Sequence, residues 1–228
     1  MIPGLLTEKE MEFMIPHFSL NSEKAVLDMM CGYGRHALAL ARKGIRVTAV
    51  DNLPEYIEEI KETALRESLP LEAVQANLAH YRPAGQYDLA ICMGNSLNFF
   101  GLADLRSILQ KTAAALLPGG HLLIHSWSFA EIAYPRFKEE GEGMVGDMNM
   151  KTRAEILFRP ARMIAWTEIT GPDGHTETKQ AIDYIYSLNE MEYWLQEAGL
   201  QLEEVYSIPG RKSFSIGEPR AYLIARKP

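Results

Sequence analysis

Cysteine is scarce in this chain, and long apolar runs are absent. The 228 residues include two cysteines, Cys31 and Cys92, which supply neither a disulfide framework nor the paired spacing of a metal site. No apolar stretch is long enough to span a bilayer, and the opening MIPGLLTEKEMEFM lacks the cationic and apolar regions of a secretory signal. We therefore expect a cytoplasmic protein without a metal ion or a membrane partner.

Positively charged residues are fewer than negatively charged ones. Lys and Arg number 23 against 30 Asp and Glu, so the formal net charge is -7. Nucleic-acid surfaces need clustered Lys and Arg, and the acidic balance therefore disfavours a nucleic-acid partner. The hydrophobic content of 47% and the charged content of 23% are ordinary for a globular chain. A chain of this length can bury one core and carry an inserted lobe, as a monomer or a homodimer.

The segment from Ala25 to Asp51 carries the clearest local pattern. It begins with a short apolar strand and turns at Gly32 and Gly34, where a missing Cβ lets the backbone approach a ligand. Helical spacing follows, and then a β-branched strand at residues 45–50 that ends in an acidic residue. A carboxylate there can accept both hydroxyls of a ribose. The segment therefore predicts a nucleoside-binding βαβ unit.

Two classes of cofactor use such a unit, and Asp28 discriminates between them. The run from Gly32 to Ala37 also fits the loose dinucleotide pattern G-x-G-x-x-G/A. In that class the pyrophosphate lies over the glycines, so a carboxylate at the end of the first strand would face its double negative charge. A ligand with an ammonium group at that end would be attracted instead. S-adenosylmethionine is such a ligand, and the segment favours it over a dinucleotide.

The run DMMCGYGRH at residues 28–36 resembles the first motif of the class I S-adenosylmethionine-dependent methyltransferases. It is most similar to the bacterial small-molecule branch, which reads DxxCGxGRH, and the resemblance extends over nearly the whole chain. One position departs, because Met30 stands where the pattern normally has Gly or Ala. With a negative φ this methionine is tolerable and the motif is intact; otherwise we expect poor cofactor affinity.

Strand-like and helical patterns alternate along the chain, which predicts an α/β fold with helices on both faces of a mostly parallel sheet. The resemblance implies a Rossmann-like sheet of seven strands, with a substrate lid between the fifth strand and the last helix. Residues 1–128 and 187–228 are expected to form the cofactor-binding domain. Residues 129–186 are expected to form the antiparallel β lid, with strand-like runs at Lys151–Phe158, Met163–Thr170 and Thr176–Tyr186.

Two capping-box patterns predict where helices begin. Thr7 has Glu10 three residues later, and Ser187 has Glu190 in the same position. In the methyltransferase family the leading helix often closes over the cofactor. We therefore expect the first helix, running toward Pro16, to lie near the site.

Ligands of such sheets bind beyond the carboxyl ends of the strands, at the switch in strand order. Asp51 is expected to hold the ribose. The resemblance places Asn77 where the family usually has an Asp that bonds the adenine amino group, although a simple turn residue is the alternative. Arg35 is expected either to pair with the methionine carboxylate or to form a surface salt bridge. The full set of predicted cofactor residues is Asp28, Met30, Cys31, Gly32, Gly34, Arg35, Asp51, Asn52, Asn77, Leu78, Met93 and Gly94.

The run from Met93 to Phe100 resembles the family's fourth motif, which passes beneath the transferring methyl group. It is not the [DN]-P-P-[YF] motif of nucleic-acid amino methyltransferases. Asn95 can orient an acceptor, and Phe99 or Phe100 can pack against the sulfonium. The predicted catalytic residues are His125, Tyr184 and Asn95, and the predicted substrate residues are Phe99, Trp127, Tyr134, Tyr186 and Arg211. For each of these, ordinary packing is the alternative reading.

These features together predict a methyltransferase that moves a methyl group from S-adenosylmethionine to a small-molecule nitrogen or oxygen by in-line displacement. Such a reaction needs positioning of the acceptor and exclusion of water, and a general base only where the acceptor carries a proton. Two alternatives stay open: a methyltransferase of RNA or protein, and a module that binds S-adenosylmethionine without chemistry.

Overall fold

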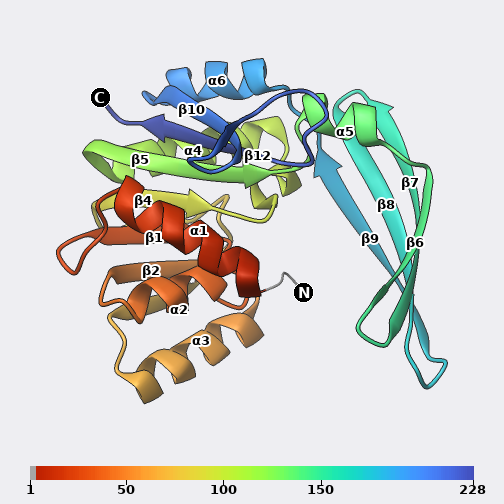
Figure 1. The fold of residues 1–228 in the computed structure, drawn as a ribbon, viewed down its shortest axis with the longest axis horizontal. Helices are drawn as coiled ribbons and strands as arrows, with labels where there is room; N and C mark the ends of the chain where they lie inside the picture. Colours follow the sequence, from red (N-terminus) through yellow and green to blue (C-terminus); the bar gives the residue numbers. More distant parts are fainter. Residues whose placement is uncertain (1–3) are drawn as a thin grey trace.

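The computed structural model describes residues 4–228 and confirms the α/β fold. It has two parts (Figure 1): a body, in which helices flank a mostly parallel sheet, and a separate antiparallel sheet that stands beside it. Over the described residues, no helix has both the length and the apolar character that a membrane crossing requires.

The body sheet has eight strands in the order β11-β10-β12-β5-β4-β1-β2-β3. Neighbours from β5 to β3 run parallel, whereas β12 pairs antiparallel with both β5 and β10. The sequence predicted seven strands, and the additional one is β11, a short edge strand paired with β10. The strands are β1 (Ala25–Met29), β2 (Arg46–Asp51), β3 (Leu71–Gln75), β4 (Tyr87–Cys92), β5 (Leu116–Ser126), β10 (Gln201–Ile208), β11 (Lys212–Ser213) and β12 (Ala221–Arg226).

Successive residues of the central strands are buried on opposite faces of the sheet. Val26 packs in one apolar cluster with Met14 and Leu40, whereas Leu27 packs in another cluster with Ile108. Each such side chain stabilises the fold by about 1.5–3 kcal/mol when fully buried. Helices α1 and α2 therefore cover one face of the sheet, and α4 and α6 cover the other. The helices are α1 (Gly4–His17), α2 (Arg35–Ala41), α3 (Pro54–Glu67), α4 (Leu102–Ala115), α5 (Ala130–Arg136), α6 (Leu188–Glu197) and the 3₁₀ turn η1 (Ser96–Phe99).

The antiparallel sheet has four strands in sequential order, although the sequence predicted three. Its strands are β6 (Glu140–Val145), β7 (Met148–Phe158), β8 (Ala161–Thr170) and β9 (Thr176–Tyr184). The missed strand is β6, where two glycines in EGEGMV weaken the local strand signal. Its whole length pairs with β7, from Glu140 opposite Arg153 to Val145 opposite Met148. Pairing with a neighbour, rather than local propensity, therefore creates this strand.

The two predicted capping boxes have different outcomes. Helix α1 begins at Gly4, so Thr7 lies inside the helix and the prediction of a cap there is wrong. The Thr7 hydroxyl instead accepts a hydrogen bond from Arg35 Nη1 at 2.9 Å. The second capping box is confirmed: Ser187 Oγ accepts the Glu190 N–H, and the Glu190 carboxylate accepts the Ser187 N–H at 2.8 Å.

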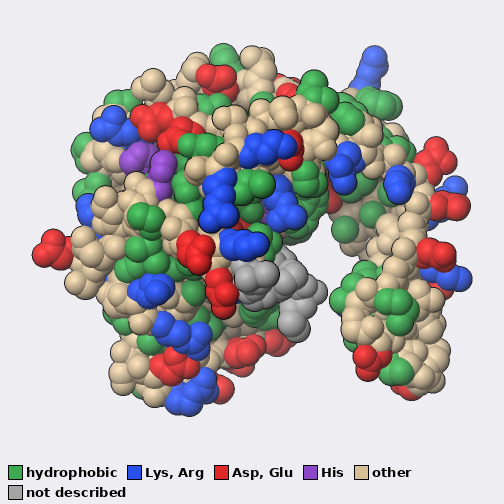
Figure 2. Space-filling view, viewed as in Figure 1, with side chains coloured by type: hydrophobic (Ala, Val, Ile, Leu, Met, Phe, Trp, Pro, Cys, Tyr) green, Lys and Arg blue, Asp and Glu red, His purple; other side chains and the backbone are tan. Residues whose placement is uncertain are grey.

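A deep hollow separates the body from the antiparallel sheet (Figure 2). The strand β9 runs from the free end of the antiparallel sheet toward the body, where it leads into α6 (Figure 1). The carboxyl ends of β4 and β5 therefore lie close to the point where the antiparallel sheet joins the body.

Candidate functional site

A cavity opens at the carboxyl ends of β1, β2 and β3. Its volume is about 490 Å³, within the range of small-molecule sites. Six of the predicted cofactor residues line it, together with the predicted substrate residue Phe99. The six are Met30, Gly32, Asp51, Asn52, Asn77 and Leu78.

The Asp51 carboxylate lies at the end of β2, directly beside the glycine turn. Its Oδ2 accepts the backbone N–H of Gly32 at 2.8 Å, and its Oδ1 accepts that of Leu53 at 3.0 Å. These bonds hold the buried side chain in one orientation. Each carboxylate oxygen keeps capacity for a second hydrogen bond. Asp51 can therefore accept two neighbouring hydroxyl groups from a ligand in the cavity.

Packing of the turn against α3 requires glycine at position 34. Gly34 has a φ of 78°, in the left-handed region that glycine adopts without strain. A Cβ at this position would lie 2.8 Å from Ile60 Cγ1. Any other residue would therefore displace α3, which packs beside the cavity.

Met30 has a positive φ, the backbone conformation for which the sequence predicts poor cofactor affinity. Its φ is 54°, and left-handed backbone costs a residue with a side chain about 1–2 kcal/mol. The side chain is half-buried, packs against the apolar core and lines the cavity. The condition set from the sequence for an intact motif, a negative φ, is therefore not met.

Asp28 is a buried carboxylate near the carboxyl end of β1. Burial raises its pKa to about 7, while Arg35 and the backbone N–H of Ala37 oppose the rise and Asp51 adds to it. Within residues 4–228, its Oδ2 has no hydrogen-bond partner. A buried acceptor without a partner costs free energy, so this oxygen is suited to a ligand that brings a donor or a positive charge.

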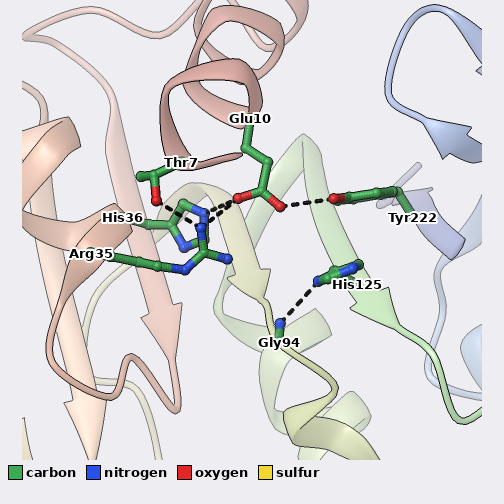
Figure 3. A network of polar contacts seen from close by, with 7 residues as sticks. All are labelled: Thr7, Glu10, Arg35, His36, Gly94, His125 and Tyr222. Carbon is green, nitrogen blue, oxygen red and sulfur yellow. Dashed lines mark hydrogen bonds and ion pairs between the residues drawn. The ribbon is translucent and has the colours of Figure 1, made fainter. Parts of the chain in front are cut away.

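Helix α1 is held against the glycine turn by a network around Glu10 (Figure 3). Glu10 Oε2 lies 2.6 Å from Arg35 Nη1 and 2.9 Å from His36 Nε2. Its other oxygen accepts the hydroxyl of Tyr222, from β12, at 2.8 Å. The carboxylate therefore joins α1, α2 and β12, and Figure 3 shows it between the three partners.

Protonation states in this network follow from burial and from the partners. Burial acts to raise the pKa of Glu10, but His36 and Arg35 outweigh it and lower the value to about 2. Burial lowers the pKa of His36, against the opposing effect of Glu10. At neutral pH the neutral His36 ring therefore donates its Nε2–H to the ionised Glu10. Arg35 is the charged partner, and its Nη2 atom has no hydrogen-bond partner within residues 4–228.

His125, a predicted catalytic residue, lies at the end of β5 behind this network (Figure 3). Its Nδ1 accepts the backbone N–H of Gly94 at 3.2 Å, and its ring stacks on Tyr222 with centroids 4.4 Å apart. Burial lowers the pKa of His125 to about 3. Because Nδ1 is an acceptor, the proton of the neutral ring resides on Nε2. In this arrangement His125 can donate a hydrogen bond from Nε2 and has no free lone pair.

Asn95, the second predicted catalytic residue, joins the ends of β4 and β5 to β9. Its Oδ1 accepts from Ser126 Oγ at 2.7 Å and from the backbone N–H of Trp127 and Ser128 at 3.0 Å each. Its Nδ2 donates to Ser128 Oγ at 2.9 Å and to Asp183 Oδ1 at 3.1 Å. The amide is buried and makes its full complement of bonds, so here it fixes other groups in place.

Four of the predicted cofactor residues have structural roles, and one of them, Asn77, also lines the cavity. Asn77 Oδ1 accepts the backbone N–H of Ala79 at 2.9 Å, which is the turn geometry considered as the alternative for it. Cys31 donates its backbone N–H to Val50 and so joins β1 to β2. Met93 is buried in the core on the face of α1 and α2, and Gly94 follows it with a φ of 75°.

The predicted substrate aromatics are divided between exposed and structural positions. Trp127 is 42% exposed and Phe99 is 49% exposed. Tyr134 is also exposed and pairs with Phe158 of β7 at a centroid distance of 6.1 Å. Tyr184, which was predicted as a catalytic residue, stacks in parallel with Tyr186, and the Tyr186 hydroxyl donates to the carbonyl of Phe100 at 2.6 Å. Tyr186 is therefore occupied in holding the end of β9 to the body.

Arg211 lines a second cavity, of about 750 Å³, between α1 and the segment that joins β10 to β12. Lys9, Arg220 and Glu218 line it as well, and Glu10 and Tyr222 form its inner wall. This cavity is therefore separate from the one beside Asp51, with the Glu10 network between them. Over residues 4–228, no group of His, Cys, Asp and Glu is arranged to hold a metal ion.

Two charged residues of the site were not singled out from the sequence. Glu10 was considered for a capping role alone, although it holds Arg35 and His36. Asp183 directly precedes the predicted Tyr184 and reaches Asn95 across 88 positions of the chain. For Asp183, the sequence feature that could have singled it out is its position in a predicted strand at the root of the inserted segment.

The charged and hydrogen-bonding groups of the site fit the cofactor expected from the sequence. Asp28 Oδ2 offers a negative partner, Arg35 Nη2 offers a positive one, and both atoms are buried without a partner in the described part of the chain. An amino acid group carries the two complementary charges. Asp51 faces the adjoining cavity with two acceptor oxygens, as a ribose requires.

In comparison with known sequences, residues 26–120 match the family model described as Methyltransferase domain. The ubiquinone biosynthesis O-methyltransferase of Yersinia pestis (strain Pestoides F) is 30% identical over 159 residues, which cover 65% of this chain and 61% of that protein. The protein of the same name from Cronobacter sakazakii is 28% identical over 157 residues. The chain spans about three fifths of the length of these curated relatives.

Solved structures share the fold over nearly the whole chain. An S-adenosylmethionine-dependent methyltransferase from Clostridium acetobutylicum superposes with a TM-score of 0.84 at 15% identity, covering 96% of this chain and 89% of that one. An amino pentose methyltransferase from Micromonospora echinaspora, solved with S-adenosylmethionine bound, gives a TM-score of 0.68 at 18% identity, covering 98% and 89%. At these identities the likeness shows the fold.

Proposed function

We propose that this chain is a class I S-adenosylmethionine-dependent methyltransferase and that it transfers a methyl group from S-adenosylmethionine to a nitrogen or oxygen atom of a small molecule. The observation that carries the proposal is the pair of oppositely charged groups, Asp28 and Arg35, each with a buried atom that has no partner within residues 4–228. Both Arg35 and the cavity residue Asp51 act electrostatically on Asp28. Their charges match an amino acid group, and Asp51 matches a ribose.

Each end of the cofactor has a proposed partner. Asp51 would accept both ribose hydroxyls, Asp28 would face the ammonium group, and Arg35 Nη2 would face the carboxylate. Asn77 and Leu78 line the part of the cavity available to the adenine. When bound, S-adenosylmethionine supplies an electrophilic methyl group on a sulfonium. The residues of the chain then need to hold the acceptor in line with that group, which can contribute about 7–11 kcal/mol toward the barrier.

A small-molecule acceptor is the class that the chain supports best. Its net charge of -7 disfavours a nucleic-acid surface, and the run Gly94–Phe100 differs from the motif of nucleic-acid amino methyltransferases. The relatives named above act, by their names, in ubiquinone biosynthesis and on an amino pentose. We propose the same general class of acceptor here, with the chain acting as a monomer or a homodimer.

We further propose that residues 129–186 act as a substrate lid on a cofactor-binding domain of residues 1–128 and 187–228. The hollow between the body and the antiparallel sheet supports this division (Figure 2). The exposed rings of Trp127 and Phe99 would line the acceptor site, with Tyr134 on the side of the antiparallel sheet. A sheet that moves over these rings would exclude water from the reacting atoms.

A second candidate function is supported by Met30. Its positive φ and its side chain in the cavity could weaken cofactor binding enough to leave a module that binds S-adenosylmethionine or its demethylated product without turnover. This candidate shares the binding site but has no acceptor.

The two functions are separated by mass spectrometry of the purified protein, followed by an acceptor screen. We expect S-adenosylmethionine or S-adenosylhomocysteine to copurify with the chain. The screen would supply S-adenosylmethionine with a labelled methyl group and a collection of small metabolites. Label transferred to a metabolite supports the enzyme. A carried-over cofactor without any transfer supports the binding module, and transfer to tRNA alone would contradict the small-molecule proposal.

A further inference from the structure

Asp183 lies at the root of the antiparallel sheet and is fixed in position by the residues around it. The backbone carbonyl of its neighbour Tyr184 accepts Asn98 Nδ2 at 2.8 Å, and the backbone N–H of Ile185 donates to Ala161 at 2.9 Å. The hydroxyl of Tyr186 is bound to the carbonyl of Phe100. Bonds to both the body and β8 therefore hold the end of β9, and with it the Asp183 carboxyl group.

Asn95 determines the orientation of this carboxyl group. Because Asn95 Oδ1 accepts two backbone N–H groups, its Nδ2 is the atom that faces Asp183. The amide thus donates to Asp183 Oδ1 at 3.1 Å and cannot rotate without losing the bonds to Trp127 and Ser128. The result is a carboxylate oriented by an amide that is itself oriented by the backbone after β5.

The second oxygen of Asp183 is free for another partner. Within residues 4–228, Asp183 Oδ2 makes no hydrogen bond and no cation pairs with the carboxylate, even though the residue is half-buried. Burial raises the pKa of Asp183 to about 6, and the Asn95 hydrogen bond opposes the rise. A carboxylate that is partly desolvated and unpaired binds a cation or a proton favourably.

Two of the other predicted site residues, His125 and Tyr186, are already occupied. His125 uses Nδ1 to accept from Gly94 and carries its proton on Nε2. The hydroxyl of Tyr186 donates to the carbonyl of Phe100, and burial raises its pKa. Asp183 is an acidic group near the ends of β4 and β5, and its Oδ2 retains free lone pairs.

We propose that Asp183 is the general base of the methyl transfer and that the acceptor is a small-molecule amine, bound as an ammonium group against Asp183 Oδ2. The exposed ring of Trp127, whose backbone N–H bonds the same Asn95 that orients Asp183, supplies an aromatic face that favours a cation. A half-buried carboxylate with an unpaired oxygen favours a cationic amine over a neutral hydroxyl. This inference rests on the proposed function.

The proposed step is balanced in atoms and charge. The ammonium group of the acceptor gives one proton to Asp183 Oδ2, which exposes the nitrogen lone pair. The nitrogen forms a bond to the methyl carbon as the carbon–sulfur bond breaks, and the electron pair of that bond stays on sulfur as a neutral thioether. The products are the methylated amine, protonated at nitrogen, and S-adenosylhomocysteine. The Asp183 proton then passes to solvent.

The test compares the wild type with Asp183→Asn, which keeps an acceptor for the Asn95 amide but cannot take a proton. Asp147→Asn is the matched control, since Asp147 is an exposed acid in the turn between β6 and β7 of the same antiparallel sheet. Calorimetry first measures S-adenosylmethionine binding, which we expect to agree within about twofold among the three proteins. Loss of cofactor binding in all three would refute the proposed function itself.

The acceptor probes are primary amines, each matched with the alcohol that carries hydroxyl in place of the amino group, such as D-glucosamine with D-glucose and 2-phenylethylamine with 2-phenylethanol. We expect the wild type to methylate amines and Asp183→Asn to lower their kcat by about 10²-fold or more, with Asp147→Asn unchanged. The wild-type rate should fall as the pH drops through about 6. The rate of Asp183→Asn should not show this decrease.

A reaction without an acceptor proton separates a base from a structural residue. S-adenosylhomocysteine and iodomethane form S-adenosylmethionine at the same site without any proton transfer. We expect Asp183→Asn to support this reaction within about threefold of the wild type. The inference is overturned if Asp183→Asn loses both reactions equally, if it methylates amines as fast as the wild type, or if the wild type methylates no amine in the panel while it binds the cofactor.

Discussion

Arg35 Nη1 lies 2.6 Å from Glu10 Oε2, so the first residue of α2 is bound to α1 through a buried ion pair. Both side chains are almost fully buried, and Glu10 also holds His36 and Tyr222. Only Arg35 Nη1 is used in this pair, which leaves Nη2 without a partner within residues 4–228. The ion pair thus orients Arg35 with one nitrogen toward α1 and another available to a ligand.

Glu10→Gln should destabilise the protein by about 3 kcal/mol, because removing one member of a buried ion pair leaves the other charge uncompensated. In the folded protein the pKa of Glu10 is lowered from its ordinary value of 4.5 to about 2. A lowered pKa contributes stability above the unfolded value that is lost as the pH falls toward the folded value. Urea unfolding from pH 7 to pH 2.5 should therefore show a decline in the wild type that is smaller in Glu10→Gln.

Glu12→Gln is the matched control for this prediction, because Glu12 is exposed on the same helix. It should change the unfolding free energy by less than about 0.5 kcal/mol. Equal stability of Glu10→Gln and the wild type at pH 7 would show that α1 does not depend on this pair.

Met30→Gly should raise the affinity for S-adenosylmethionine at least severalfold. The substitution removes a side chain from the cavity and relieves a backbone strain of about 1–2 kcal/mol, at the expense of some apolar packing. Calorimetric titration measures the affinity. Ser68→Gly is the control, since Ser68 also has a positive φ, 53°, but ends α3 away from the cavity. It should stabilise the protein by about 0.5–1 kcal/mol without changing affinity; a Met30→Gly protein with weaker binding would reverse the role given to Met30.

Asp28→Asn should stabilise the free protein above pH 7 while weakening cofactor binding. Burial raises the pKa of Asp28 to about 7, and a raised carboxyl pKa contributes stability at low pH that is lost as the pH rises through the folded value. The neutral amide avoids this loss, so at pH 8 we expect about 1–3 kcal/mol of added stability in Asp28→Asn. Thermal and urea unfolding across pH 5 to 9 measure it.

The same residue gives cofactor binding a pH dependence. Affinity for S-adenosylmethionine should decline as the pH falls through about 7, because protonated Asp28 no longer attracts the ammonium group. Asp28→Asn should bind at least about tenfold more weakly at pH 8 and without this dependence. Asp104→Asn, an exposed acid in the first turn of α4, should behave as the wild type. Identical titration curves for wild type and Asp28→Asn would remove Asp28 from the site.

Asn95→Ala should lower the unfolding free energy by about 2–4 kcal/mol. It leaves the backbone N–H of Trp127 without its acceptor, whereas that of Ser128 keeps Ser126 Oγ, and a buried unsatisfied donor costs about 1–3 kcal/mol. Its φ of 71° adds strain for alanine. Asn21→Ala, in an exposed turn, should cost less than about 1 kcal/mol. Comparable losses in the two variants would contradict the structural role of Asn95.

The body of the fold was predictable because its signals are local. The glycines at 32 and 34, the strand beginning at Ala25 and the acidic end of β2 all lie within one short segment. The structure places Gly32 and Asp51 of this segment at one cavity. Ser187 and its capping box were equally accessible, since both partners are three residues apart. These features depend on periodicity and turn chemistry, which a sequence displays directly.

The features that were missed depend on partners distant in the chain. Strand β6 forms because β7 pairs with it, and Thr7 lies inside α1 with its hydroxyl bound to Arg35. The role proposed for Asp183 depends on its hydrogen bond with Asn95, which is 88 positions away. Nor could the sign of φ at Met30 be deduced, because it is imposed by the turn between β1 and α2. Tertiary contacts of this kind override local propensity.

Calorimetric titration of the purified protein with S-adenosylmethionine and with NADH, in the wild type and in Asp51→Ala, tests the central claim most directly. We expect saturable, micromolar binding of S-adenosylmethionine by the wild type, no binding of NADH, and at least about tenfold weaker binding by Asp51→Ala through the loss of a buried, charged hydrogen-bond acceptor. Saturable binding of NADH without binding of S-adenosylmethionine, or equal affinity in the two proteins, would contradict the site described here.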